Sequence, residues 1–155
     1  MKPEAILREA KEKYGIEEFY ACVSGGKDSI TMADVTDKAG YLKGVIFIDT
    51  TIGIIETQNF VKDYCKERGW NLTILRPKVN FEEFVRRFGF PTAASHNIVM
   101  GFLKYHPLRS FVLQKKKEGK KVALVSGVRK FESKRRMRTA KPILKDGSMI
   151  FVAPL

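Results

Sequence analysis

The chain has 155 residues, 44% of them hydrophobic, and a net charge of +12. That length suits one domain with a substantial core, so we expect residues 1–155 to form a single domain. Two cysteines and two histidines are too few for a disulfide framework or a zinc site, and no apolar run approaches the roughly 18 residues that span a membrane. The amino-terminal residues carry no signal-peptide pattern, which predicts a cytoplasmic protein.

Positive charge is concentrated in residues 115–141, which hold twelve Lys or Arg residues and two Glu residues. This balance of +10 accounts for most of the net charge. Such a segment can bind polyanions, including nucleotides and nucleic acid. It can also be a solvated helix face followed by a basic loop, an interpretation that fits the lysines of 115–121 better than the later arginines.

Hydrophobic periodicity predicts alternating helices and strands along the chain. In the first half we expect helix 3–14, strand 19–24, helix 28–39, strand 44–49, helix 56–68 and strand 71–75. In the second half we expect helix 81–88, helix 96–106, helix 107–118, strand 121–126 and strand 149–153. Nearly continuous apolar strands that alternate with helices indicate an α/β fold, a three-layer sandwich around a parallel sheet of about five strands.

The first strand runs into the sequence Ser24-Gly25-Gly26-Lys27-Asp28-Ser29, directly before a predicted helix. Glycines let backbone N–H groups turn inward, and the helix start adds further N–H groups and a positive dipole end. Serine hydroxyls and the Lys27 ammonium suit phosphate. Asp28 fits better if a divalent cation connects it to the phosphates. The pattern therefore predicts a phosphate-binding loop, although a Gly-Gly pair alone is usually a plain turn.

Two more predicted strands end in polar clusters. One ends in Asp49-Thr50-Thr51, with Glu56-Thr57 opening the next helix, and another ends in Ser126-Gly127-Val128-Arg129. Ligands of parallel sheets bind beyond the carboxyl ends of the strands, so one crevice can collect all three clusters. Arg129 and Arg136 are suited to gripping phosphate or sulfate oxygens in a fork.

These motifs resemble a known family. The Ser24–Ser29 string resembles the S-G-G-x-D-S loop of the ATP pyrophosphatases, whose fold is the PP-loop, Rossmann-like type. Residues 47–57 resemble the I-D-T-G-x-x-x-P-E-T segment of the phosphoadenylyl sulfate (PAPS) reductase family, residues 104–108 its K-x-x-P-L segment, and residues 126–136 its G-x-R-x-x-E-S-x-x-R segment. The matches run in order from residue 20 to about residue 155. Family members usually continue into further helices, so the chain is either a minimal member or a fragment that lacks a carboxyl-terminal region.

The resemblance implies roles for individual residues. Catalysis by charge neutralisation would fall to Lys27, Asp28 and Arg129, with Asp28 as the Mg²⁺ ligand. The nucleotide, ATP or PAPS, would contact Ser24, Gly25, Gly26, Lys27, Asp28, Ser29, Phe47, Ile48, Asp49, Thr50, Lys104, Gly127, Arg129 and Arg136.

The function implied is ATP-dependent adenylyl transfer that releases pyrophosphate, in sulfur metabolism. Two alternatives stay open: a PAPS or APS reductase, and a nucleotide-binding or nucleic-acid-binding module without catalysis. Sulfonucleotide reductases of the family usually carry an altered loop and a catalytic cysteine near the carboxyl terminus, whereas this chain has no cysteine after Cys65. The expected partners are an adenine nucleotide and, through residues 115–141, a nucleic acid or a protein sulfur donor; a homodimer is also left open.

Overall fold

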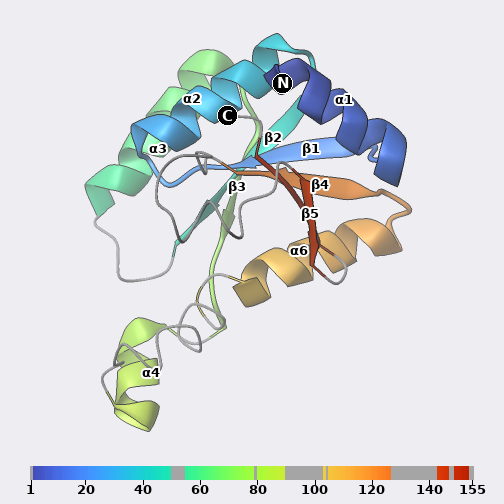
Figure 1. Cartoon of the computed structure of the whole chain (residues 1–155). Helices are drawn as coiled ribbons and strands as arrows, with labels where there is room; N and C mark the ends of the chain where they lie inside the picture. The colour runs from blue at the N-terminus through green and yellow to red at the C-terminus, as the bar shows by residue number, and fades with distance from the viewer. Residues whose placement is uncertain are drawn as a thin grey trace, which may run out of the picture.

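The computed structural model describes residues 2–49, 55–78, 80–89, 103, 105–126, 143–146 and 149–153. Within these ranges a six-stranded sheet has the strand order β3-β2-β1-β4-β6-β5 (Figure 1). The elements are α1 (Pro3–Tyr14), β1 (Glu18–Cys22), α2 (Lys27–Lys38), β2 (Leu42–Ile48), α3 (Ile55–Arg68), β3 (Leu72–Leu75), α4 (Phe81–Phe88), α6 (His106–Lys117), β4 (Val122–Val125), β5 (Ile143–Asp146) and β6 (Met149–Val152).

The predicted α/β fold with five parallel strands is confirmed. Strands β3, β2, β1, β4 and β6 pair in parallel, each with its neighbour in that order. Strand β5, which pairs antiparallel with β6 at the edge of the sheet, was not predicted from the sequence. Most of the helix expected over residues 96–106 lies outside the described residues.

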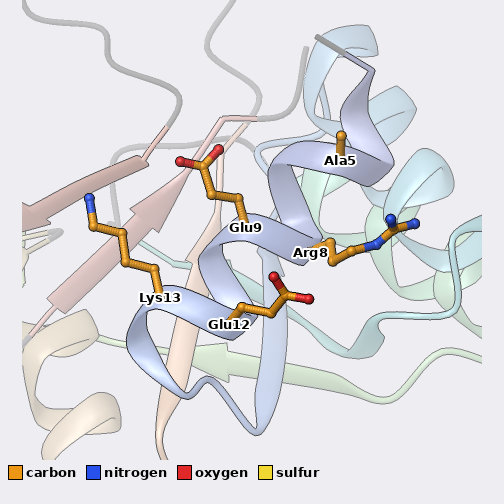
Figure 2. A pocket seen from close by; sticks show the side chains of 5 residues that line it. All are labelled: Ala5, Arg8, Glu9, Glu12 and Lys13. Carbon is orange, nitrogen blue, oxygen red and sulfur yellow. The ribbon is translucent and has the colours of Figure 1, made fainter.

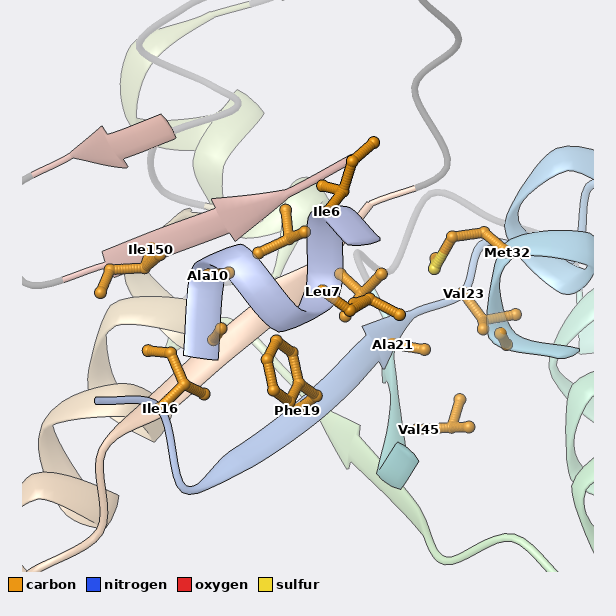
Figure 3. Close-up of a cluster of buried hydrophobic side chains, with 14 of the residues drawn as sticks. Ile6, Leu7, Ala10, Ile16, Phe19, Ala21, Val23, Met32, Val45 and Ile150 are labelled. Carbon is orange, nitrogen blue, oxygen red and sulfur yellow. The ribbon is translucent and has the colours of Figure 1, made fainter. Parts of the chain in front are cut away.

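The parallel strands are apolar on both sides because helices cover both faces of the sheet, as a three-layer sandwich requires. Alternate residues of β1 illustrate this: Phe19 and Ala21 face α1 and α2, whereas Tyr20 faces α6. Figure 3 shows Ile6, Leu7 and Ala10 of α1 lying over the sheet on the first of these faces. All three side chains of α1 are at most 5% exposed.

Helix α6 covers the opposite face. Its Leu108 and Val112 are buried in a second cluster, the members of which are Tyr20, Ile46, Leu108, Val112, Val122, Leu124 and Met149. The rings of Tyr20 and Phe111 meet edge to face at a centroid distance of 5.0 Å. Burial on both faces fixes the strand ends in space, and these ends carry the candidate site.

The short helix α4 has its own local support. Asn80 caps it, because its Oδ1 accepts a hydrogen bond from the Glu83 backbone N–H at 2.7 Å. Its Phe84 is buried against Leu103. Among the described helices, none combines the length and the apolar character that a membrane crossing needs.

Candidate phosphate-binding site

The Ser24–Ser29 segment lies where the sequence predicted it, between the end of β1 and the first turn of α2. The central position of β1 in the sheet is what places this loop between the ends of β2 and β4. Gly26 is the N-cap residue of α2, so Lys27, Asp28 and Ser29 form the first helical turn. Backbone N–H groups in this turn have no acceptor within the helix, which leaves them available for an anion.

Gly25 has a backbone conformation that only glycine adopts easily, with φ at +90°. Space is equally restrictive: a Cβ at this position would lie 2.6 Å from Cγ2 of Thr57, in the first turns of α3. Gly26 has neither restriction, because its φ is −79° and the nearest heavy atom to a Cβ there would be Ser24 Oγ at 3.7 Å. Gly25 is therefore the residue that allows the chain to turn tightly against α3.

The two serines of the motif hold the loop closed. Ser29 is buried; its hydroxyl donates to the Gly26 carbonyl at 2.9 Å and accepts from the Ser24 N–H at 3.2 Å. The two hydroxyl oxygens are 3.4 Å apart. Because the Ser29 hydroxyl already donates to Gly26, the Ser24 hydroxyl is the donor of that pair. Ser29 is thus a structural closure of the loop, while Ser24 is exposed at its surface.

Lys27 and Asp28 bring opposite charges to the first turn of α2. Lys27 is exposed, whereas Asp28 is half-buried. In the described part of the chain, no three or more His, Cys, Asp and Glu side chains gather into a metal cage. One carboxylate beside a phosphate loop still fits Mg²⁺, which commonly takes one or two carboxylates and completes its shell with phosphate oxygens and water. Asp28 is the described residue that would hold such an ion.

The ends of β2 and β4 lie at the same edge of the sheet as the loop. We call this the carboxyl edge: the residues just beyond the parallel strands, among them Val23, Asp49 and Ser126. Each still hydrogen-bonds to a neighbouring strand, Val23 N–H to Ile46 O at 2.9 Å, Asp49 N–H to Leu75 O at 2.8 Å, and Ser126 N–H to Val152 O at 2.7 Å. The described residues that open the three polar clusters, Ser24, Asp49 and Ser126, therefore follow neighbouring strands at one edge of the sheet, as expected from the sequence.

The backbone of Ile48 faces the loop side of β2. Along a strand, successive residues direct their N–H and C=O groups to opposite neighbours. Ile46 accepts from Val23 on the β1 side and Asp49 donates to β3. Ile48, which alternates with Asp49, therefore turns its N–H and C=O toward the β1 side, beyond Cys22, the last β1 residue paired with β2. The side chains of Phe47 and Ile48 pack into the two core clusters, so their backbone is what they can offer a ligand.

Arg76 is a charged residue of the carboxyl edge that the sequence analysis missed. It directly follows β3, and its Nε donates to Oδ2 of Asp49 at 3.2 Å. The Arg76 side chain is 60% exposed, so it remains accessible from solvent while it is paired with Asp49. Ligands of parallel sheets bind beyond the carboxyl ends of the strands, and Arg76 is the first residue after a predicted strand. The same rule that indicated the other strand ends therefore applies to Arg76.

Five predicted site residues lie outside the described part of the chain. They are Thr50, Lys104, Gly127, Arg129 and Arg136. Their assignment remains a prediction from the sequence.

A surface hollow of about 420 Å³ is found elsewhere, along the outer face of α1. Figure 2 shows Glu9 and Lys13 leaving the helix on one side and Arg8 on the other. The lining mixes acidic and basic side chains around Ala5 and includes none of the predicted site residues. We assign no role in nucleotide binding to this hollow.

Comparisons with known proteins agree with this fold. A family model described as the phosphoadenosine phosphosulfate reductase domain matches residues 18–155. The uncharacterized protein MJ0973 of Methanocaldococcus jannaschii is 34% identical over 110 residues, which are 71% of this chain. The match covers 25% of the length of that relative, so the chain spans about a quarter of it.

Two solved structures are similar in fold. The phosphoadenylyl-sulfate (PAPS) reductase of Candida auris, in a phosphate complex, superimposes over 100% of this chain and 72% of its own with a TM-score of 0.66 and 22% identity. The NH3-dependent NAD synthetase of Campylobacter jejuni, in complex with a nitrate ion, covers 84% of this chain and 56% of its own with a TM-score of 0.54 and 16% identity. At these identities the likeness supports the fold alone.

Proposed function

Because the chain belongs to the phosphoadenosine phosphosulfate reductase domain family, we propose that it binds an adenine nucleotide at the carboxyl edge and transfers the adenylyl group of ATP. The observation that carries this proposal is the intact Ser24–Ser29 loop, closed by its serines and followed directly by the start of α2. Lys27 and the N–H groups of the first helical turn would hold the β- and γ-phosphates.

The base would lie against β2. The N–H and C=O of Ile48 form a neighbouring donor and acceptor on the side of β2 that faces the loop. An adenine edge offers the complementary pair, a ring nitrogen that accepts and an amino group that donates. This arrangement supports a nucleotide that extends from the loop after β1 to the end of β2.

The chemistry asks little of the protein beyond position and charge. An acceptor oxyanion attacks the α-phosphorus and forms a new P–O bond. The bond from that phosphorus to the bridging oxygen breaks, and pyrophosphate leaves with the electron pair. Lys27 and the helix N–H groups stabilise the negative charge on the departing phosphates. A Mg²⁺ ion held by Asp28 would neutralise phosphate charge.

A second candidate is sulfonucleotide reduction, which the name of the matching family model favours. This reaction needs a reactive thiol. Cys65 is buried and burial raises the pKa of its thiol, which keeps it in the poorly nucleophilic protonated form at neutral pH. Cys22, the other cysteine, is half-buried on β1. A reductase activity would therefore draw its thiol from another protein.

The basic segment suggests a macromolecular partner, but the lysines that the structure describes, those of residues 115–121, are not placed to bind the nucleotide. Lys120 and Lys121 precede β4, at the edge of the sheet opposite to Ser126 and the loop. Lys115 packs over the rings of Tyr20 and Phe111. We propose that the exposed lysines Lys116, Lys117, Lys120 and Lys121 contribute to a polyanion-binding face that is separate from the nucleotide site.

Product analysis separates the two candidate reactions. The chain is incubated with Mg²⁺ and α-labelled ATP together with small oxyanion acceptors, and in parallel with PAPS and a dithiol reductant. Adenylyl transfer gives pyrophosphate and a labelled adenylyl product or AMP, and the α,β-nonhydrolysable ATP analogue gives neither. Release of sulfite from PAPS, with ATP left intact, would replace the first proposal by the second.

A further inference from the structure

Helix α3 packs against the phosphate loop at Gly25. Cγ2 of Thr57 lies 2.6 Å from the position that a Cβ of Gly25 would take, and Cγ2 of Val61 lies 3.8 Å from it. Residues 57 and 61 are four apart and so share one face of the helix. Val61 is fully buried, and Thr57 is half-buried at the edge of this contact. The methyl group of Thr57 therefore fills the space under Gly25.

The α3 side of this contact is restrained. Thr57 is β-branched, which restricts its χ1 angle within a helix. Farther along, α3 is tied to α2 by an ion pair between Arg68 Nη1 and Asp34 Oδ1 at 2.9 Å. Since α2 begins at the loop, α3 supports the loop at Gly25 and is also fixed to the helix that follows it.

We propose that Thr57 is a positioning residue for the phosphate loop: its methyl group, packed against Gly25, holds the loop N–H groups in the geometry that binds pyrophosphate groups. The proposal rests on the function proposed above for the same loop. Thr57 does not itself contact the phosphate; it acts through Gly25.

Three variants of Thr57 separate its methyl group from its hydroxyl. Thr57→Val keeps a methyl at the same branch and removes the hydroxyl, Thr57→Ser does the reverse, and Thr57→Ala removes both. Thr73→Ser, on the half-buried strand β3, is a matched control for loss of a threonine methyl. Calorimetric titration with Mg²⁺–ATP and with inorganic pyrophosphate measures phosphate binding, and the urea midpoint checks that each variant is folded.

We expect the Thr57→Ser and Thr57→Ala affinities for both ligands to fall about tenfold, which is less than the roughly hundredfold cost of misplacing a group by about 1 Å. Thr57→Val and Thr73→Ser retain the wild-type affinity. This rescue by valine is a result that general loss of stability would not produce. The inference is overturned if Thr57→Ser binds as the wild type does, or if Thr57→Val is as weak as Thr57→Ala.

The same titrations distinguish failure of this inference from failure of the proposed function. If the wild-type chain binds neither ATP nor pyrophosphate, the function fails and the inference fails with it. If the wild type binds both and the Thr57 variants bind equally well, the role of Thr57 alone is rejected.

Discussion

At the scale of single residues, the loop depends most on Gly25. Its positive φ costs a residue with a side chain about 1–2 kcal/mol, because Cβ approaches the backbone. At Gly25 the contact with Thr57 adds a steric conflict, since the 2.6 Å separation is shorter than any normal carbon–carbon contact. A side chain at the neighbouring Gly26 would meet neither the unfavourable φ nor the steric conflict. Of the two glycines, only Gly25 is therefore required by the backbone geometry.

Gly25→Ala is expected to destabilise the fold more than Gly119→Ala does. Gly119 also has a positive φ, +81°, but no atom lies within 4 Å of a Cβ built there. The Gly119→Ala variant therefore measures only the cost of a positive φ for alanine. At position 25, overpacking against Thr57 adds about 1–3 kcal/mol to the loss of stability. Urea denaturation of both variants measures this difference. Equal losses of stability in the two variants would mean that the Thr57 side chain moves aside at no cost in free energy.

The residues of the site were only partly predictable from the sequence. The Ser24–Ser29 motif could be recognised because its residues are adjacent and its chemistry is local. The support from Thr57 could not, because Gly25 and Thr57 are far apart in sequence and meet through the packing of α3 on the sheet. Arg76 was missed although it is the first residue after a predicted strand, because a single arginine has no motif and its partner Asp49 follows a different strand.

At the scale of elements, Arg68 links α3 to α2 through Asp34, and three further contacts within and just after α3 hold its guanidinium in place. The Arg68 guanidinium pairs with Asp34 at 2.9 Å and donates from Nη2 to the Tyr64 hydroxyl at 2.9 Å. It also stacks over the rings of Tyr64 and Trp70. The hydrogen bond to Tyr64, with Asp34 nearby, raises the pKa of Arg68 above its ordinary value. Such a network contributes more to the stability of the fold than an isolated surface ion pair does.

Arg68→Ala is therefore expected to lower the urea midpoint clearly more than Arg86→Ala. Arg86 is the matched control because it forms a pair with Glu82 within the same helix, at 2.7 Å, with a side chain that is 76% exposed. Loss of the α2–α3 tie is also expected to weaken ATP binding by loosening the start of α2. Equal midpoints for the two variants would show that the Arg68 cluster contributes no more than an ordinary surface pair.

Strand β5 shows which elements the sequence pattern misses. Periodicity found the five parallel strands, each an apolar run. Four-residue β5 contains Lys145 and Asp146 and does not alternate with a helix. The sequence Asp146-Gly147 between two short apolar runs is a recognised hairpin signal and could have revealed β5. The strand order in the sheet has no local signal, since it depends on how the helices cross over.

At the scale of the whole molecule, the described part of the chain holds two separate groups of charged residues, one at each edge of the sheet. The phosphate loop and its neighbours Asp49 and Arg76 lie at the carboxyl edge, and Lys120 and Lys121 lie at the opposite edge. The +12 net charge is thus not simply the charge of the nucleotide site. The core that separates the two edges is largely apolar on both faces of the sheet, and its buried residues include Tyr20 and Cys65, which titrate in alkali.

The fold is expected to lose stability in alkali. Burial raises the pKa of the Tyr20 hydroxyl above 10.0 and that of the Cys65 thiol above 9.0. Hydrogen bonding to Tyr20 raises the pKa of Lys115. All three groups hold their protons more tightly when folded, so their contribution is complete below pH 9.0 and declines as the pH rises through the folded pKa values.

Urea denaturation between neutral pH and about pH 11 measures this decline. Tyr20→Phe keeps the ring contact with Phe111 but removes the ionisable hydroxyl, so its stability is expected to fall less steeply above pH 10.0. Tyr105→Phe, at a residue that is 46% exposed, is the control and should keep the wild-type slope. Parallel curves for Tyr20→Phe and the wild type would exclude Tyr20 as a source of the pH dependence.

The central claim is that the Ser24–Ser29 loop binds the phosphates of an adenine nucleotide. The most direct test is calorimetric titration of the full chain with Mg²⁺–ATP, in the wild type, in Lys27→Ala and in Lys43→Ala. Lys43 is an exposed lysine at the start of β2, on the edge opposite to the loop, so its removal controls for the loss of one positive charge. We predict that Lys43→Ala binds ATP like the wild type and that Lys27→Ala binds it about tenfold or more weakly, because a charge-assisted contact is lost. Equal affinities for the two variants, or no binding of ATP by the wild type, would contradict the assignment of this loop.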